Sequence, residues 1–349
     1  MNPAIKTALM LLACSAMMPT AAFPQSTDNK RRVVTLEIYS DAKAPVGTQQ
    51  KWLQMLQDVG ADRVTSKTGQ PRTPEVEEIQ TSGAVLIKVT GFVMGGQLKL
   101  PGGSFSIRDK TAIRDLLQRL RDDGAKVALA EKKAFGMTSE QLVGLHEQLS
   151  EPVDFNTAGR NAGEVVAKLI AKSGLKFNLD NSARVAINGN EKVAEELEGI
   201  SIGTALAAVV RPLGLVVQPQ RKQGQTVEVN LVDSRSVKGE HWPIGWPISR
   251  APVAVEPKLF ERLDIEIRGF PMKDALDAVE KRAGVPFFYD HNTMAREGIE
   301  LTETKATVVQ KKAALMVVIS KLLRQTKPRM SEELRVDENG KPFLWITVK

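Results

Sequence analysis

The sequence predicts an α+β fold, in which an N-terminal α+β domain precedes two small two-layer modules of βαβ type. Three observations support this prediction. Short apolar segments with the two-residue period of strands alternate with segments that have the helical period. Glycines stand where several of the predicted helices end, as at left-handed C-terminal caps. The second half of the sequence also repeats itself: Gly174 aligns with Gly284, an offset of 110 residues (284 − 174).

The first 22 residues have the pattern of an export signal. An apolar segment at 7–18, too short to span a bilayer with its flanks, precedes small residues at Thr20 and Ala22 that suit cleavage after Ala22. The alternative is a short buried helix of a cytosolic domain. Cys14, the only cysteine, lies in LLAC, which resembles a lipobox and makes a lipoprotein a second alternative. Cleavage at Ala22 predicts a periplasmic or extracellular chain without disulfides or cysteine-bound metal.

Length and composition fit a globular protein of two or three domains, with 349 residues, 42% of them apolar and 26% charged. The net charge of +7 falls to +6 (7 − 1) when Lys6 leaves with the signal. Lysines and arginines are scattered along the chain, whereas nucleic-acid binding needs them gathered on one face. We therefore expect no nucleic-acid partner and no transmembrane span in the mature chain. A solvated mixed-charge surface is the first interpretation, and an anionic wall polymer is a second.

The N-terminal domain is predicted to cover residues 30–150. Strands are expected at 33–38, 75–80, 84–94 and 97–100, the last two joined by a turn at Gly95-Gly96. One helix is expected to end at Gly60. A second is expected to begin after Asp109 and end at Gly124, and a third to begin after Thr138.

The two modules are predicted at 151–232 and 263–349. Residues 165–180 align with 275–290 at an offset of 110 (275 − 165), and 205–210 align with 314–319 at an offset of 109 (314 − 205). Each copy is predicted to contain two units, and each unit consists of a strand, a helix that ends at a glycine, and a second strand. A glycine at the helix end supplies the positive φ of a tight stop, and one apolar stripe on each helix covers a small sheet.

Residues 233–262, between the copies, are predicted to form a semi-rigid linker. Four prolines interrupt this segment, and neither the helical nor the strand period is visible in it. The linker contains Trp242 and Trp246, each followed by proline.

The repeated unit resembles the short N-terminal (STN-like) domain found ahead of secretins and TonB-dependent receptors. The resemblance rests on DIEIRGFPMKDALDAVEKRAGVPFFYD (264–290), on the helix that follows and on the closing strands ELRVDE and PFLWITV. It covers 151–349 in two copies and implies a small two-layer α+β envelope domain that docks partners and carries no chemistry. No strands of an outer-membrane barrel follow the module here, so secretin or receptor function is not implied. The layout is also similar to that of exported bacterial proteins.

Asp290-His291, an acid beside a histidine where a predicted strand ends, is the first candidate for a functional site. The first copy has Asp180-Asn181 at the same place, so only the aspartate is shared. Aspartate at a strand exit commonly accepts hydrogen bonds from the backbone that follows. We therefore predict turn or cap chemistry, with catalysis as the alternative.

The linker provides the second candidate. The faces of Trp242 and Trp246 could grip a sugar or a peptide, or could fill gaps between the modules. The residues predicted to bind a ligand are Trp242, Trp246, His241, Asp290 and His291. The three histidines have no metal-binding spacing, and we expect neither a metal nor a cofactor.

The sequence thus predicts a non-catalytic exported protein that binds or assembles in the cell envelope, with an envelope protein or an anionic wall polymer as partner. The alternative is a secreted hydrolase with its site in the N-terminal domain, built from Asp41, Asp109 and His146. A hydrolase would show a histidine or serine and two carboxylates converging in one cleft.

Overall fold

The structure is a computed structural model that describes residues 31–40, 47–69 and 73–349. The predicted export signal, Cys14 and Asp41 lie outside these residues. The chain has the expected α+β fold and divides into two compact units after Ala125. The division coincides with a break in helix α2 (Lys110–Leu129), where Gly124 has φ 77° and a non-helical ψ.

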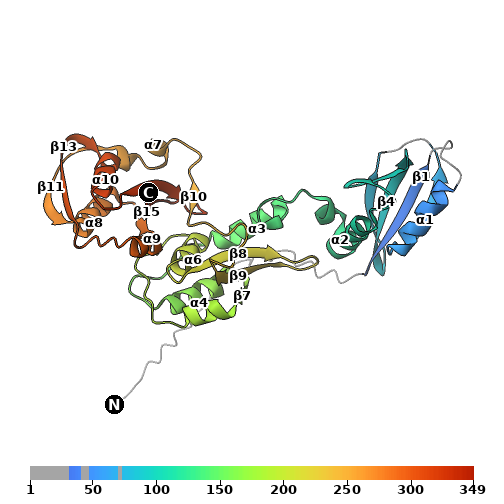
Figure 1. Ribbon diagram of the computed structural model, residues 1–349, viewed down its shortest axis with the longest axis horizontal. Helices are drawn as coiled ribbons and strands as arrows, with labels where there is room; N and C mark the ends of the chain where they lie inside the picture. Colours follow the sequence, from blue (N-terminus) through green and yellow to red (C-terminus); the bar gives the residue numbers. More distant parts are fainter. Residues whose placement is uncertain (1–30, 41–46, 70–72) are drawn as a thin grey trace, which may run out of the picture. The chain divides into compact units, whose positions relative to one another are not determined.

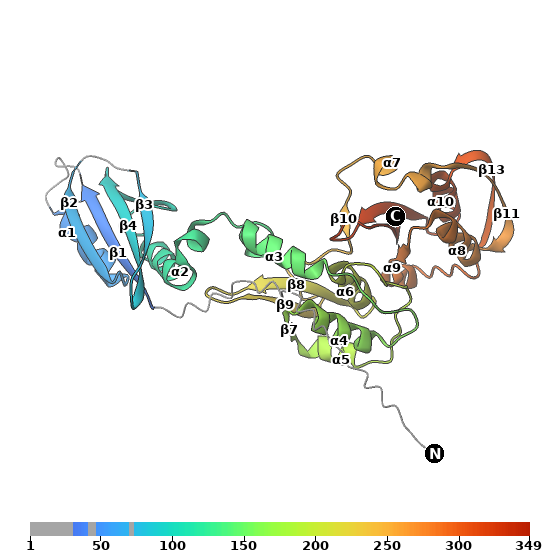
Figure 2. The ribbon, with the colours of Figure 1, turned by 180° about the vertical axis from the view of Figure 1, so that it is seen from behind.

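The first unit is a sheet covered by helices (Figure 1). Strands β2, β1 and β4 run parallel, and β3 and β5 pair antiparallel with successive parts of β4 (Figure 2). Its elements are β1 (Arg31–Ser40), α1 (Thr48–Asp58), β2 (Arg63–Thr68), β3 (Glu75–Gln80), β4 (Ala84–Met94), β5 (Gln97–Leu100), β6 (Gly103–Phe105) and most of α2.

Helices α1 and α2 lie on the same face of this sheet. Gln49 of α1 donates a hydrogen bond to Ser66, which is paired with the buried Ile38. Arg32, two residues before Val34 and thus on the same face as Ile38, donates to the carbonyl oxygen of Asp122 in α2 at 3.0 Å. The buried face of the sheet is therefore the one that carries the aliphatic side chains of β1.

Helix α3 (Ser139–Leu149) belongs to the second unit, so the boundary predicted at residue 150 differs from the structure. Thr138 caps α3 as expected, in a capping box with Gln141. Leu145 and Leu149 pack into the same core as the helices that follow. A segment belongs to the core that buries its apolar stripe, and the stripe alone does not show which core that is.

The second unit contains two modules in which helices and strands follow one another in a similar order and three strands pair in the same way. In the first module, β9 lies between β7, to which it is parallel, and β8, to which it is antiparallel. In the second module, β15 lies in the same way between β12 and β14. The first module contains α4 (Ala162–Ser173), β7 (Lys176–Leu179), α5 (Asn181–Ile187), α6 (Ile202–Val210), β8 (Leu215–Arg221) and β9 (Val227–Asp233). The second contains α8 (Met272–Ala283), β12 (Phe287–Tyr289), α9 (His291–Arg296), α10 (Leu315–Leu323), β14 (Met330–Val336) and β15 (Pro342–Val348).

The register of the repeat agrees with the sequence alignment in one helix pair and differs from it in the other. Gly174 and Gly284, aligned at 110, end α4 and α8 with φ 65° and 67°. Helices α6 and α10 begin after Ser201 and Ala314, an offset of 113 (314 − 201). The alignment at 109 is thus wrong by four residues, about one helical turn. A four-residue shift keeps an apolar stripe on the same face, so the pattern alone could not detect the error.

The predicted linker is largely part of the second module. It contains β10 (Trp246–Pro247), which pairs with β14, helix α7 (Pro252–Val255) and η2 (Pro257–Phe260). Leu259 of η2 is 110 residues after Leu149 of α3 (259 − 149), and both are fully buried. The repeat therefore includes the end of α3 in the first copy and η2 in the second.

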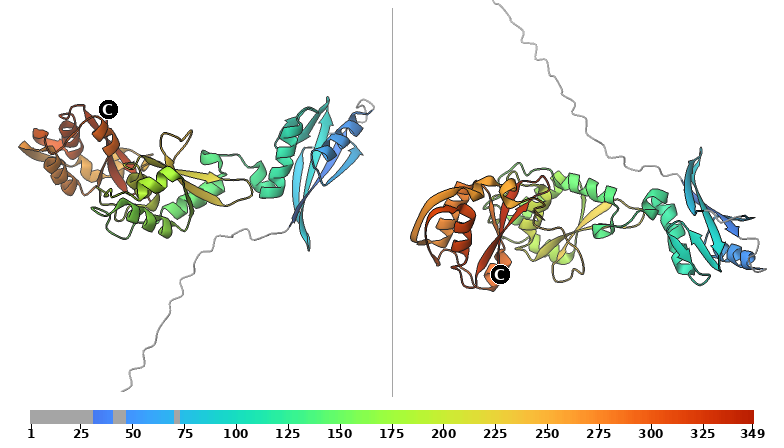
Figure 3. Two further views of the ribbon diagram at one scale, coloured as in Figure 1. Left: turned by 60° about the horizontal axis from the view of Figure 1, so that its bottom comes forward. Right: turned by 90° about the horizontal axis from the view of Figure 1, so that it is seen from above.

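The second module also has a two-stranded ribbon, β11 (Arg262–Pro271) with β13 (Lys305–Ala314), at the end away from the first module (Figure 3). In the first module only two isolated bridges remain, Pro152 with Ser201 and Asn161 with Lys192. These bridges correspond to the two ends of the β11–β13 pairing at offsets of 110 (262 − 152) and 113 (314 − 201).

Gly245 is a position where the backbone requires glycine. It has φ 64°, and a Cβ atom there would collide with the ring of Phe343. We expect Gly245→Ala to lower the free energy of unfolding by about 2–3 kcal/mol, because left-handed strain and overpacking add. Gly298, with φ 66° and open space around its Cβ position, is the matched control, for which we expect about 1 kcal/mol. Equal losses in urea unfolding would contradict the role of Phe343.

Candidate functional site: the junction between the modules

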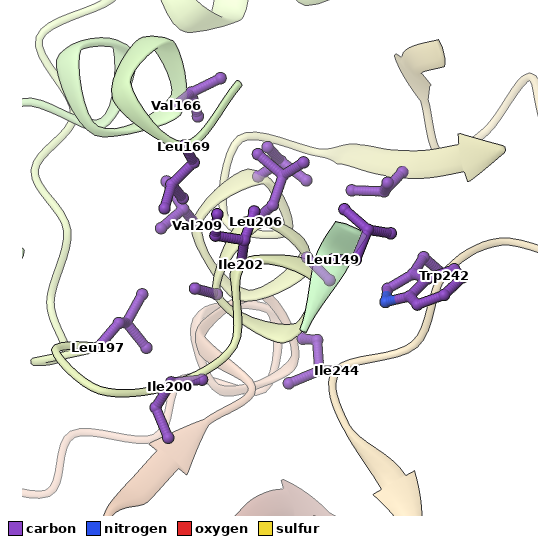
Figure 4. Packing of buried hydrophobic residues seen from close by; sticks show 14 of the residues in the cluster. Leu149, Val166, Leu169, Leu197, Ile200, Ile202, Leu206, Val209, Trp242 and Ile244 are labelled. Carbon is purple, nitrogen blue, oxygen red and sulfur yellow. The ribbon is translucent and has the colours of Figure 1, made fainter. Parts of the chain in front are cut away.

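The two modules of the second unit share one hydrophobic core at their junction. Phe288, Phe343 and Trp345, on the outer face of the second module's sheet, belong to the same buried cluster as the first module's helices. Figure 4 shows Leu149 between α6 and Trp242, with Ile244 beside α6. Because this face is buried, the two modules form one body.

The equivalent face of the first module is polar. Asn178, Glu228 and Asn230 stand there in place of the three aromatic residues, at offsets of 110 (288 − 178) and 115 (343 − 228). Their side chains bond to one another, Asn178 to Glu228 at 2.8 Å and to Asn230 at 3.3 Å. A polar outer face is typical of a terminal repeat.

Asp290 joins the modules and also caps α9. The residue is 3% exposed, and its carboxylate accepts hydrogen bonds from the amide and the hydroxyl of Thr293. Arg211, the C-cap residue of α6, donates to both carboxylate oxygens, with Nε at 3.1 Å and Nη2 at 2.8 Å. Burial acts to raise the pKa of Asp290, but the hydrogen bonds and charge of Arg211 outweigh burial and keep the pKa below its ordinary value.

The predicted cap chemistry of the two aspartates is confirmed. Asp180 caps α5 by accepting from the amide of Ala183 at 2.7 Å, as Asp290 caps α9. Of the two aspartates, Asp290 also has an arginine partner across the junction among the described residues.

His291 bonds to Glu195, which lies in the loop before α6. Glu195 also accepts from the amide of Tyr289 at 3.4 Å and so covers the free edge of β12. The hydrogen bond that Glu195 accepts from the imidazole raises the pKa of His291. A raised pKa extends the pH range in which His291 is an imidazolium, and an imidazolium here forms an ion pair with Glu195 across the junction.

The turn between β14 and β15 caps the N-terminus of α6 with two carboxylates. Asp337 accepts from the amide of Ser201 at 2.9 Å, and Glu338 accepts from the amide and hydroxyl of Thr204 at 3.2 and 2.9 Å. The indole N–H of Trp242 donates to Glu338 at 2.6 Å. Burial raises the pKa of Glu338 to about 7, against the hydrogen bonds from Trp242 and Thr204, which lower it.

We expect Glu338 to make the stability of the junction depend on pH. Its folded-state pKa of about 7 lies above the ordinary 4.5, so its contribution is fully present below pH 4.5 and is lost as pH rises through 7. The difference between these two pKa values, about 2.5 (7 − 4.5), corresponds to about 3 kcal/mol. We expect the wild type to lose about 3 kcal/mol more than Glu338→Gln between pH 4.5 and 8 in urea unfolding. Parallel pH profiles for the two proteins would contradict this expectation. The pH profile of His291→Asn is measured as well, because the raised pKa of His291 also makes the free energy of unfolding fall as pH rises.

Of the two linker tryptophans, Trp242 is fully buried and Trp246 half-buried. Trp242 is 1% exposed, stacks on Phe135 with ring centroids 5.9 Å apart and meets Trp246 edge-on at 5.2 Å. The faces of the Trp242 ring are thus covered by other side chains of the protein, which agrees with the alternative that this tryptophan fills a gap between the modules. The indole nitrogen of Trp246 is buried without an acceptor, and His241 is exposed.

Two of the three residues proposed for a hydrolase site, Asp109 and His146, lie in the described part of the chain, and both make structural contacts there. Asp109 accepts from the amide of Ser106 at 2.7 Å just before α2, in the first unit. His146 lies on α3, in the second unit, with its ring 6.1 Å from that of Trp246. Asp41 lies outside the described residues.

Among residues 31–40, 47–69 and 73–349, no group of three or more histidine, cysteine or acidic side chains could hold a metal ion. In the same part of the chain, no helix has the length and apolarity that crossing a membrane requires. No family model matches the chain, and searches of curated proteins and of solved structures gave no match.

The sequence analysis did not predict four of the residues that form the junction: Glu195, Arg211, Asp337 and Glu338. Two of them do have a signal in the repeat. Asp337 and Glu338 replace Lys222 and Gln223 of the first copy at an offset of 115 (337 − 222), a change from basic to acidic. Only an alignment in the correct register shows this difference.

Proposed function

We propose that the protein is a non-catalytic binding or assembly protein of the cell envelope, exported and built on two STN-like modules. One observation carries the proposal. The acid–histidine pair that the sequence offers for chemistry, Asp290-His291, holds the modules together through Arg211 and Glu195. Both side chains are engaged in contacts between the modules, and these contacts support a structural role for the pair.

The envelope location rests on the predicted export signal and on the resemblance of the repeated unit to envelope domains. A rigid pair of modules suits such a role, because a preorganised surface loses little conformational entropy when a partner binds. The partner we infer is an envelope protein, and an anionic wall polymer is the alternative.

The test combines capture with an activity screen. The tagged mature chain is cross-linked in intact cells and captured from envelope extract, and mass spectrometry identifies the attached molecules. We expect a discrete partner, and a mature N-terminus after residue 22. The same protein is screened for hydrolysis of ester, peptide, glycosidic and phosphoester substrates. Turnover that is lost in His146→Ala or His291→Asn would overturn the proposal in favour of the hydrolase.

A further inference from the structure

Helix α10 occupies in the second module the place of α6 in the first, but its outer stripe is uncovered. On α6 the second module covers this stripe, and Thr204 is 0% exposed. Val317 takes the place of Thr204 at an offset of 113 (317 − 204) and is 45% exposed. The next positions of the stripe on α10, one and nearly two turns on, are Lys321 and Arg324, both exposed.

The contacts that cover α6 show what kind of surface fits this stripe. Arg211 at its C-cap binds a buried aspartate, and the amide of Thr204 binds the acidic turn of the β14–β15 hairpin. Arg324 is the C-cap residue of α10, and Ala314 at the N-cap supplies no side-chain cap. The second module thus has an arginine at the position that anchors the junction in the first, and among the described residues no side chain pairs with it.

Charge strengthens the case for an acidic partner. The continuous segment 305–324, which forms β13 and α10, has five basic residues and no acidic residue, a net charge of +5. The equivalent segment 192–211 of the first module has two basic and three acidic residues, a net charge of −1 (2 − 3). A surface with one sign of charge attracts a partner of the opposite sign and repels its own copy.

A second copy of this chain does not offer the matching surface. Its first module would have to supply it, and that module carries Lys222-Gln223 where the second module carries Asp337-Glu338. The aromatic face is likewise replaced there by Asn178, Glu228 and Asn230. The first module of a second copy therefore does not fit α10, and the partner we infer is a different protein.

We propose that Val317, Lys321 and Arg324 of α10 form a docking surface for a protein that presents an acidic turn beside apolar side chains, repeating the contact of the second module with α6. This inference rests on the proposed binding role and assigns it to one surface.

The test uses a cyclised synthetic hairpin of residues 330–348, which contains the acidic turn and the aromatic strand, as the probe. It is titrated into the full mature chain labelled with ¹⁵N. We expect saturable binding below about 1 mM, amide shifts at 315–318 and 324, and binding at least about tenfold weaker for Arg324→Glu or Val317→Lys. Val185→Lys, at a 75% exposed valine of α5, is the matched control and should bind as the wild type does. Thermal melts verify that each variant is folded.

Three outcomes would overturn the proposal: no binding, equal binding of a scrambled hairpin of the same composition, or self-association of the chain that Val317→Lys abolishes. The second outcome would indicate a non-specific surface for anions, and the third would indicate a dimer. Capture of the same envelope partner by Arg324→Glu and by the wild type would reject this surface while leaving the proposed function standing.

Discussion

Arg211→Ala should lower the free energy of unfolding of the second unit by about 2–3 kcal/mol. The substitution leaves the carboxylate of Asp290, whose side chain is 4% exposed, without its charged partner. Breaking a buried ion pair costs about 3–5 kcal/mol, and we reduce that range because the side chain of Arg211 is itself 38% exposed and Thr293 still donates to Asp290. The measurement is urea unfolding, followed by intrinsic tryptophan fluorescence.

The repeat supplies a matched control for this prediction. Arg324 holds the same C-cap position in the second module but is exposed, so Arg324→Ala should change stability by less than about 0.5 kcal/mol. The double variant Arg211→Ala with Asp290→Asn should recover part of the loss, because no buried charge is then left unpaired. Equal losses for Arg211→Ala and Arg324→Ala would show that the arginine acts as a helix cap and not through the junction.

Trp242→Ala should have the largest effect of any single substitution at the junction, a loss of about 3–5 kcal/mol. The indole is 1% exposed and packs against Phe135 and Trp246, and its N–H donates to Glu338. Its removal leaves a cavity and deprives a buried carboxylate of a donor. Chemical denaturation of the purified variant measures the loss, and an unchanged midpoint would contradict the packing role of this residue.

Trp242→Phe separates the hydrogen bond from the packing. The ring largely fills the same space, but no N–H faces Glu338. Burial raises the pKa of Glu338 to about 7, so the carboxyl is ionised above this pH and protonated below it. Loss of the indole donor costs more when Glu338 is ionised, because a buried charged acceptor is then left without a hydrogen bond. We expect a loss of about 2 kcal/mol more at pH 8 than at pH 5. A loss that does not change with pH would indicate that packing alone accounts for Trp242.

The boundaries of the helices could be predicted where a local signal marks them. Gly174 and Gly284 end their helices with positive φ, and Thr138, Asp180 and Asp290 cap theirs, as the sequence indicated. These features depend on bonds within a few residues of chain. The linker was misjudged because short elements such as β10 and α7 have too few residues to show a period.

The candidate site could be predicted only in part. The sequence selected Asp290, His291 and Trp242, and the structure places all three at the junction. It did not select Arg211 or Glu195, since a partner some 80–100 residues away leaves no mark on the local pattern.

The sequence by itself determined that the chain is α+β, that its second half is a duplication, and that an aspartate caps the helix after the first strand of each copy. Only the tertiary structure decided that α3 and the linker belong to the duplicated part, that the second helix pair aligns one turn further on, and that one module packs its aromatic sheet face on the other. The reason is physical. Caps and glycine stops are local interactions, whereas burial depends on which surfaces meet, and two copies of one pattern become different when only one of them has a neighbour.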